Sequence, residues 1–339
     1  MNPFFSVIIP CCDVADYVVE CLDSLRRQNA SWECLVVIED SKDATESVIR
    51  QNVGDDPRFK IFTEPRSGSP ATPRNTGLKH STGEYVVFMD GDDTFEEGAL
   101  AKLQEEIGRE PGGDLYSIVM LRGDKTLDQF AWVPVGKFYT GPELLVDIAR
   151  RMPIFTAMAP FQVCRRAFMD ENHLRFVDQL RYEDEEFTPR AIYKAKKFVP
   201  THIPFYRYRM RPGQITSTVV YQHWPDFTVV YRRLFQFWGA ERPADDVSRA
   251  LARLLLNKFL YLFFHPRYLK CVTPRRQRAL LWSLFLGGTA NFRALSQYAS
   301  LPKRLGAWIV HLSWRLGTMF PARVYFWLYF KLVDMRDRS

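Results

Sequence analysis

Residues 84–93 read Glu84-Tyr85-Val86-Val87-Phe88-Met89-Asp90-Gly91-Asp92-Asp93, a short apolar run that ends directly in a cluster of carboxylates. An apolar run of this length, bounded by turn-forming residues, is typical of a buried β-strand. Carboxylates so close together repel one another, and a divalent cation between them is the usual reason for placing them at a strand end. The stretch therefore predicts a strand followed by a metal site.

The chain before this stretch alternates apolar runs with amphipathic ones. The apolar runs are residues 5–10, 34–38 and 59–62, and the helical patterns after them are residues 17–28, 45–51 and 75–80. Strands that alternate with helices predict an α/β domain with a mostly parallel sheet flanked by helices. Ligands of such sheets bind beyond the carboxyl ends of the strands, so we expect Pro10, Glu39 and Asp90 to lie at one edge.

Further elements are expected downstream, and the pattern changes character near residue 220. We predict strands at residues 114–121, 130–135 and 205–211, and helices at 141–151 and 189–195. From Trp224 onward the pattern is helical and amphipathic. We therefore predict an α/β domain over residues 1–219 and a helical region over residues 220–339.

The helical region is also the basic part of the chain. Residues 220–339 have a net charge of +13, whereas residues 1–219 have a net charge of −6. Between Val247 and Val333 there is no Asp or Glu, but there are 14 Lys or Arg and four Trp. This composition favours contact with an anionic membrane surface through residues 247–333. Two other roles are packing on the catalytic core, with Arg and Lys stems covering apolar surface, and contact between copies of the chain; no nucleic acid is expected.

Cysteine usage and the apolar segments indicate a cytoplasmic protein. The six cysteines form no Cys-x-x-Cys pair, which favours reduced, buried thiols. The N-terminal residues show no secretory signal pattern, and the longest uncharged segment of the tail, residues 279–292, has 14 residues. That is short of the roughly 20 residues that span a bilayer. We expect the chain in the cytoplasm, either free or peripheral on the inner face of the membrane.

Six short motifs occur in an order that resembles the family 2 glycosyltransferases, whose catalytic domain has the GT-A fold. They cover residues 4 to about 217 and lie at 6–10, 39–43, 74–77, 88–93, 183–187 and 206–216. The resemblance implies an inverting transferase that moves a sugar from a nucleoside-diphosphate sugar, a UDP-sugar by default. The acceptor would be a hydroxyl of a glycan or a lipid-linked acceptor in bacterial cell-surface polysaccharide synthesis, and Mn²⁺ or Mg²⁺ would assist.

The resemblance also implies roles for single residues. Asp92 would ligate the metal, with Asp90 near the metal and the ribose. Asp184, beside Glu183, would be the base that takes the acceptor proton, and crowding by neighbouring acids would raise its pKa toward a useful range. The other residues implied at the donor are Pro10, Cys12, Asp13, Glu39, Ser41, Arg74, Asn75, Gly91, Arg207 and Arg209.

Three arginines near the last motif suggest a diphosphate clamp. Arg207, Arg209 and Arg211 alternate along the chain, so a strand would place all three on one face. The base-binding region departs from the family, because Cys12 stands where many members have an aromatic residue and Ile38-Glu39-Asp40-Ser41 replaces Asp-Asp-Gly-Ser. The identity of the nucleotide base is therefore open.

Structural roles compete with these assignments. Residues 90–93 could form a solvated turn that caps a helix starting at Thr94, and residues 183–186 could be an acidic helix N-terminus. The three arginines could be a solvated strand edge, and Asn75 a simple helix cap.

Two other classes of protein share parts of the pattern. Residues 88–94 also match the signature of haloacid-dehalogenase-like phosphatases, in which Asp90 would be a nucleophile and Asp92 its acid/base partner. A catalytically inactive scaffold that docks on membranes through its tail is the second alternative.

Overall fold

The computed structural model describes residues 2–152, 155–211 and 224–264, and scattered positions after them (273, 277, 309, 319 and 322–326). The chain divides into two compact units, one made of Met1–Leu144 with Ala157–Pro212 and the other of the remaining residues. The predicted boundary at 219/220 falls within residues 212–223, outside the described residues.

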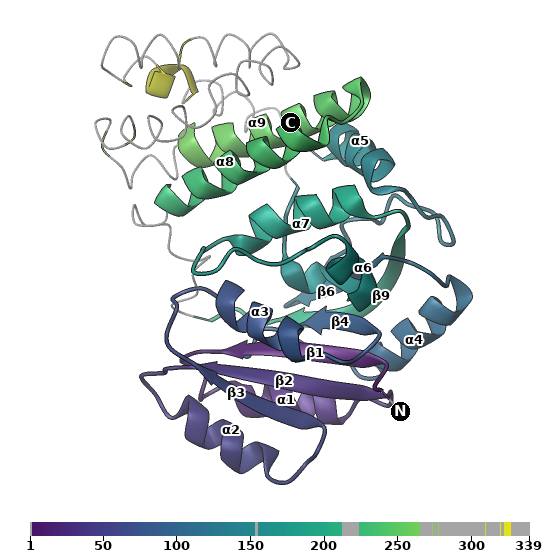
Figure 1. Cartoon of the computed structure of the whole chain (residues 1–339), viewed down its shortest axis with the longest axis vertical. Helices are drawn as coiled ribbons and strands as arrows, with labels where there is room; N and C mark the ends of the chain where they lie inside the picture. The colour runs from purple at the N-terminus through teal and green to yellow at the C-terminus, as the bar shows by residue number, and fades with distance from the viewer. Residues whose placement is uncertain are drawn as a thin grey trace. The chain divides into compact units, whose positions relative to one another are not determined.

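The first half of the sheet is parallel, as the alternation of strands and helices predicts (Figure 1). β1 pairs in parallel with both β2 and β4, and β2 pairs in parallel with β3. The strands are β1 (Phe5–Cys11), β2 (Trp32–Glu39), β3 (Phe59–Glu64) and β4 (Tyr85–Phe88), and the helices between them are α1 (Val18–Arg26), α2 (Thr45–Val53) and α3 (Ala71–His80). The carboxyl ends of these four strands therefore lie at one edge.

The second half of the sheet mixes directions. Among the described residues the strand order is β3-β2-β1-β4-β8-β6-β9-β5, with β7 paired to β6. β8 is antiparallel to both β4 and β6, β9 is parallel to β6, and β5 is antiparallel to β9. These strands are β5 (Thr94–Phe95), β6 (Leu115–Arg122), β7 (Lys125–Leu127), β8 (Gln162–Arg165) and β9 (Phe198–Tyr208). The pairing of β5 with β9 brings residues 206–207 beside the end of the carboxylate stretch.

Further helices complete the described residues. They are α4 (Ala99–Arg109), α5 (Gly141–Arg151), the 3₁₀ turn η1 (Ala159–Phe161), α6 (Arg166–Glu171), α7 (Glu183–Lys194), α8 (Trp224–Glu241) and α9 (Asp245–Phe264). Thr140 opens α5 as the sequence indicates, because its backbone N–H and hydroxyl both donate to Glu143.

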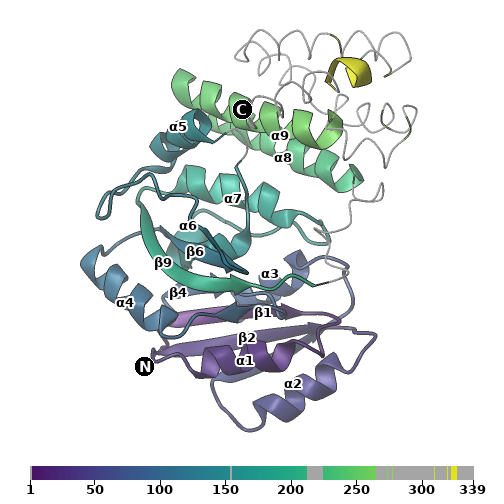
Figure 2. The same cartoon turned by 180° about the vertical axis from the view of Figure 1, so that it is seen from behind.

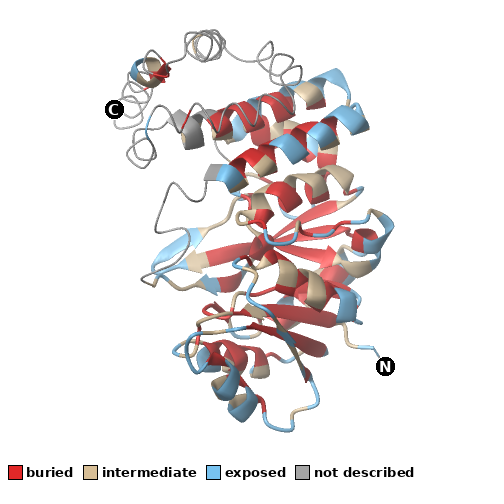
Figure 3. Cartoon of the chain, turned by 60° about the vertical axis from the view of Figure 1, so that its left-hand side comes forward, coloured by how far each residue is buried: buried red, intermediate tan, exposed pale blue. Residues whose placement is uncertain are grey.

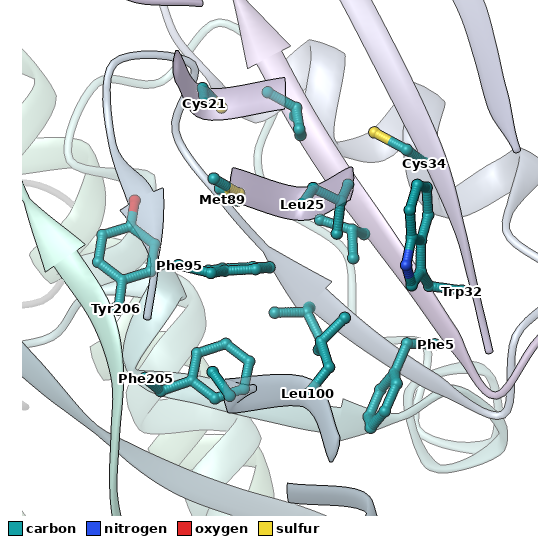
Figure 4. Close-up of a cluster of buried hydrophobic side chains, with 14 of the residues drawn as sticks. Phe5, Cys21, Leu25, Trp32, Cys34, Met89, Phe95, Leu100, Phe205 and Tyr206 are labelled. Atoms are coloured by element: carbon teal, nitrogen blue, oxygen red, sulfur yellow. The ribbon is translucent and has the colours of Figure 1, made fainter. Parts of the chain in front are cut away.

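Both faces of the sheet are covered by helices. α1, α2 and α4 bury their apolar sides on the face that carries Val7 and Ile9, seen from behind in Figure 2. Figure 4 shows part of this cluster, where Leu25 and Leu100 meet Phe95 and Phe205. α3 covers the opposite face, so β1 and β2 are buried along their lengths (Figure 3).

The strand predicted at 130–135 and the helix start at Thr94 are wrong, whereas the helix predicted at 189–195 and the strand predicted at 205–211 exist with other bounds. Residues 130–135 form turns, and their apolar pattern reflects the burial of Phe130 and Val133 in a loop. The helix predicted at 189–195 begins earlier, at Glu183, because the acidic run is its first turn. Thr94 starts the short strand β5 rather than a helix, so the carboxylates do not cap one. The last predicted strand begins at Phe198 and ends at Tyr208.

The second unit contains α8 and α9, where the tail is predicted to be helical. Tyr231 of α8 contacts Phe259 of α9 edge to face, with ring centroids 5.7 Å apart. In the part of the chain that the structure describes, no helix is long and apolar enough to cross a membrane. Most of residues 247–333, the predicted membrane-contact segment, lies outside the described residues.

Candidate active site

The carboxylates after β4 face different surroundings. The side chain of Asp90 is 32% exposed and that of Asp92 is 12% exposed. Asp93, taken as a whole residue, is only 1% exposed. The hydroxyl of Tyr206 donates to Asp93 at 2.6 Å and accepts the backbone N–H of Asp90 at 3.0 Å. Burial, together with repulsion from Asp90 and Asp92, raises the pKa of Asp93 to about 8. Asp93 therefore supports the loop, while Asp90 is partly exposed and Asp92 is mostly buried.

Gly91 allows this loop to lie tightly on the end of β1. A Cβ at this position would stand 3.0 Å from the Cys11 sulfur and 3.3 Å from the Pro10 carbonyl oxygen. A side chain there would require the Cys11 side chain or the loop to shift by a few tenths of an ångström. The role of Gly91 is thus to bring backbone, rather than a side chain, against the strand end.

Two arginines form ion pairs with Asp90 and Asp92. Arg74 contacts Asp90 at 2.7 Å, and Arg211 contacts Asp92 at 2.5 Å. Within the described residues no three His, Cys, Asp or Glu side chains are grouped to enclose a metal. Mg²⁺, however, is usually held by one or two carboxylates and the substrate's phosphates rather than by a protein cage. The two hard oxygen donors, and the mutual repulsion that a cation would relieve, fit an ion shared with a bound diphosphate.

The three arginines of the predicted clamp do not lie together: Arg207 is apart from Arg209 and Arg211. The Arg209 backbone N–H donates to Asp93 at 2.7 Å, and its guanidinium reaches the Asp92 carbonyl and Glu20. Arg209 and Arg211 both lie over the ring of Tyr17, 5.5 and 5.2 Å from its centroid. Arg207 instead pairs with Glu96 at 2.6 Å. Arg209 and Arg211 therefore lie at the carboxylate cluster, and Arg207 lies beside it.

The candidate base stands at the start of α7. Asp184 is half-buried and its Oδ1 accepts the backbone N–H of Glu185 at 2.9 Å. Glu183 is buried and paired with Arg74, and burial raises its pKa although Arg74 favours the ionised form. Burial opposes the charge of Arg74, but Asp90, Glu183 and Asp184 together raise the pKa of this guanidinium. One arginine thus lies within electrostatic reach of both the metal-side and base-side carboxylates.

The ends of β1 and β2 meet at the same edge. Asp13 forms a bidentate pair with Arg66, 2.7 Å at the shorter contact, and accepts the Lys42 backbone N–H at 2.7 Å. The backbone N–H of Asp13 donates to Ser41 at 3.2 Å. Cys12 lies beside them, half-buried, with its sulfur 4.0 Å from the Asp40 carbonyl oxygen. The predicted convergence of residues after these strands is confirmed.

Glu39 closes a loop at this end. Its Oε1 accepts both the backbone N–H of Ser67, at 2.7 Å, and the Ser67 hydroxyl. Glu39 is only 4% exposed, so its carboxylate orders residues 65–69 beside the β2 end. Contact of Glu39 with a donor stays a prediction.

Several residues at this edge were not assigned from the sequence. Tyr206 was noted only as part of a motif, and its contact with Asp93 spans 113 residues, so no local pattern indicates it. Arg66 and Ser67 lie in a turn-rich stretch, and Tyr17 and Glu20 belong to an amphipathic segment that reads as ordinary helix. An aromatic or charged residue near the carboxyl end of a neighbouring strand is the signal that could have suggested them.

Comparisons with known proteins identify the domain. Residues 6–172 match the family model described as Glycosyl transferase family 2. TarS of Staphylococcus aureus (strain Mu50), a poly(ribitol-phosphate) beta-N-acetylglucosaminyltransferase, is 30% identical over 267 residues, which cover 77% of this chain and 44% of TarS. A poly(ribitol-phosphate) beta-glucosyltransferase of Bacillus spizizenii is 29% identical over 281 residues, covering 79% and 41%. The chain thus spans less than half the length of these two curated relatives.

A solved structure has the same fold. The crystal structure of S. aureus TarS 1-349 in complex with UDP-GlcNAc aligns with a TM-score of 0.76 at 23% identity, covering 96% of this chain and 90% of that one. The predicted GT-A fold is confirmed, and none of these comparisons supports the phosphatase alternative. Through residues 6–172, the chain belongs to the family 2 glycosyltransferases.

Proposed function

We propose that this chain transfers a sugar from a UDP-sugar to an acceptor hydroxyl with inversion at the anomeric carbon. The observation that carries the proposal is the arrangement around Arg74. This one guanidinium contacts the accessible carboxylate Asp90 and the residue that precedes the candidate base Asp184. A donor site and a base on the same side of the sheet are what a single-step displacement requires. The named activities of the two curated relatives support the same class of reaction.

The metal end of the donor would lie at Asp90 and Asp92. These residues would hold Mn²⁺ or Mg²⁺, which when bound supplies positive charge for the leaving diphosphate. Asp93 and Tyr206 hold the loop from behind through the 2.6 Å contact. Asp92 would exchange its ion pair with Arg211 for the ion, and Arg211 would then be available to the diphosphate.

Arg209 and Arg211 would stabilise the diphosphate from the opposite side. Guanidinium groups bind phosphate oxygens through paired N–H donors, and both arginines already lie at the acidic cluster. The ring of Tyr17 supports both guanidinium planes. Arg207, held by Glu96, is the member of the three with the least to contribute.

The nucleotide would extend over the ends of β1 and β2. Asp13, Ser41 and Arg66 present polar atoms there, and Glu39 orders the loop that borders them. Cys12 offers a small thiol in place of an aromatic ring. Recognition of the base would therefore rest on hydrogen bonds rather than on stacking at this position.

Asp184 would act as the base. Its carboxylate would accept the proton of the acceptor hydroxyl while that oxygen attacks the anomeric carbon, and the bond from this carbon to the diphosphate oxygen would break with both electrons leaving on the nucleotide. Glu183 is buried and paired with Arg74, so its role would be to hold the start of α7.

The acceptor would be a hydroxyl-rich glycan or polymer of the cell surface. The relatives' names point to polyol-phosphate polymers, and a lipid-linked glycan is the other candidate. We also propose that residues 247–333 hold the enzyme at an anionic membrane surface, from their charge and tryptophan content. Binding to anionic vesicles that is released by high salt would support this; equal binding to neutral vesicles would contradict it.

A donor panel tests the function directly. Purified protein is incubated with UDP-glucose, UDP-GlcNAc, UDP-galactose and a GDP-sugar, with Mn²⁺ or with EDTA, and with or without a poly(ribitol-phosphate) acceptor. We expect metal-dependent release of UDP from one donor, faster with a suitable acceptor. Release of phosphate from a phosphomonoester would support the phosphatase alternative. Absence of both UDP release and phosphate release would support the inactive scaffold.

A further inference from the structure

Arg74 and Asn75, the first two residues of the motif at 74–77, direct their polar side-chain atoms to other groups of the protein. Arg74 is 3% exposed, and its two terminal nitrogens contact Asp90 and Glu183. Its remaining donor, Nε, is buried without a hydrogen-bond partner among the described residues. A buried guanidinium with one unsatisfied donor is costly, and its two carboxylate contacts are the compensation that the structure shows.

Asn75 binds the segment that leads to the candidate base. Its amide nitrogen donates to the Phe176 carbonyl oxygen and to the Asp178 carboxylate, both at 2.9 Å, and its amide oxygen accepts the Phe176 backbone N–H at 3.0 Å. A fourth hydrogen bond from the same helix lies next to these: the Thr72 hydroxyl accepts the Gln179 backbone N–H at 3.3 Å. Side chains of α3 therefore bind the backbone of Phe176 and Gln179 and the carboxylate of Asp178.

The ring of Phe176 packs against aromatic residues of β4 and α7. It stacks on Phe187 of α7 with centroids 4.2 Å apart and meets Phe88 of β4 edge to face at 5.2 Å. The Arg74 guanidinium lies 5.5 Å from the centroid of the same ring. The ring thus joins the strand that ends at the metal-side carboxylates to the helix that begins at the base.

The backbone before α7 needs such support. Gln179 and Tyr182 adopt left-handed conformations, with φ of 59° and 60°, and Tyr182 immediately precedes Glu183. Left-handed backbone costs a non-glycine residue on the order of 1 kcal/mol and persists where surrounding contacts enforce it. The contacts from α3 support this segment, as does the Ser69 hydroxyl, which donates to the Leu180 carbonyl oxygen.

We propose that Arg74 and Asn75 form a clasp that positions the base Asp184 relative to the donor-side carboxylate Asp90, and that neither residue binds the donor. The proposal rests on the function proposed above, because it takes Asp184 as the base. It differs from the assignment of both residues to the donor that the family resemblance implies. Displacement of a base by 1 Å is enough to reduce turnover about 100-fold, so the clasp would act on kcat.

Variants with matched controls separate positioning from binding. Asn75→Asp keeps the side-chain size but removes both amide donations and adds repulsion toward Asp178. Asn172→Asp is its control, because Asn172 is also half-buried and donates to a backbone carbonyl oxygen, at 2.9 Å from Phe168. Arg74→Met and the conservative Arg74→Lys test the guanidinium. Arg165→Met, which breaks a 2.6 Å pair with the buried Asp114, controls for loss of an ion pair.

The kinetic readout is kcat against donor KM, with UDP affinity measured by calorimetry in Mn²⁺. We expect kcat to fall about tenfold in Asn75→Asp and about 100-fold or more in Arg74→Met, with partial recovery in Arg74→Lys. In these variants the donor KM and the UDP dissociation constant should stay within about threefold of the values of the parent chain. In both control variants all three constants should stay within about twofold of the parent values. Loss of UDP affinity in proportion to kcat/KM would assign the pair to the donor and overturn the proposal.

Hydrogen exchange supplies a readout that does not depend on activity. Peptides that cover residues 174–187 should exchange at least several-fold faster in Asn75→Asp and Arg74→Met than in either control. Peptides from the rest of the unit should exchange at unchanged rates. Unchanged exchange of residues 174–187 would refute the clasp even if turnover falls. A parent chain without any transfer or hydrolysis would refute the proposed function, while the exchange result would still decide the clasp.

Discussion

Glu33 allows a stability prediction with a magnitude taken from the structure. It lies on β2 at the amino end of the sheet, opposite the candidate site, and is 4% exposed. Oε1 accepts bonds from the Ser6 hydroxyl, the Thr82 hydroxyl and backbone N–H, and the Gly83 backbone N–H, while Oε2 pairs with Lys60 at 2.6 Å. Burial raises the pKa of Glu33, but these donors outweigh it and lower the pKa from 4.5 to about 2.

The depressed pKa sets both the size and the pH window of the effect. A difference of about 2.5 units, at about 1.4 kcal/mol per unit, corresponds to about 3 kcal/mol of folding free energy. Because the folded pKa is the lower one, this stability is present above pH 4.5 and is lost as the pH falls toward 2. Glu33→Gln should therefore destabilise the unit by about 3 kcal/mol at pH 7 but by only about 1.5 kcal/mol at pH 3.

Urea unfolding at several pH values between 3 and 7 measures this difference. Hydrogen exchange of peptides from β1 and β2 reports on this unit specifically. Glu46→Gln is the control, because its pair with Arg50 is solvent-exposed and should change stability by no more than about 0.5 kcal/mol. A Glu33→Gln variant that is as stable as the parent chain at pH 7, or whose deficit does not shrink toward pH 3, would refute the reasoning.

Two further predictions concern packing and the acidic loop. Gly77→Ala places a Cβ 2.4 Å from Ile8 Cγ2, so it should lower the free energy of unfolding of the unit by about 1–3 kcal/mol in urea unfolding. The double variant with Ile8→Ala should lose less unfolding free energy than the sum of the two single variants. Tyr206→Phe removes the hydroxyl between Asp93 and Asp90, so it should cost about 1–3 kcal/mol and raise the Mn²⁺ concentration needed for half-maximal UDP binding; an unchanged Mn²⁺ requirement would show that this hydroxyl does not support the metal end.

The parallel half of the fold could be predicted because its signals are local. The run at 34–38 is apolar at every position, as a strand buried on both faces must be, and the structure extends it only to Trp32–Glu39. The prediction of a strand at 130–135 used the same signal, a run of buried apolar residues, but there it was wrong. Buried apolar residues in a loop, such as Phe130, look like a strand when no partner is known.

In the candidate site, too, the local motifs could be predicted and the long-range contacts could not. Asp90, Asp92 and Asp184 were assigned from motifs whose chemistry is contained in a few adjacent residues. The contacts that organise them join residues far apart in the chain, such as Arg74 to Glu183 across 109 residues. Nothing in the local sequence distinguishes an arginine that binds phosphate from one that is buried between two carboxylates, so only the fold could show which role the geometry favours.

In the proposed donor site, Asp90 and Asp92 would share a divalent ion with a nucleoside diphosphate. Calorimetric titration of UDP into the parent chain and into Asp92→Asn, each with Mn²⁺ and with EDTA, tests this arrangement most directly. We predict that Mn²⁺ tightens UDP binding to the parent chain by about tenfold or more and has little effect on Asp92→Asn. UDP affinity that is the same with Mn²⁺ and with EDTA in the parent chain would contradict the account.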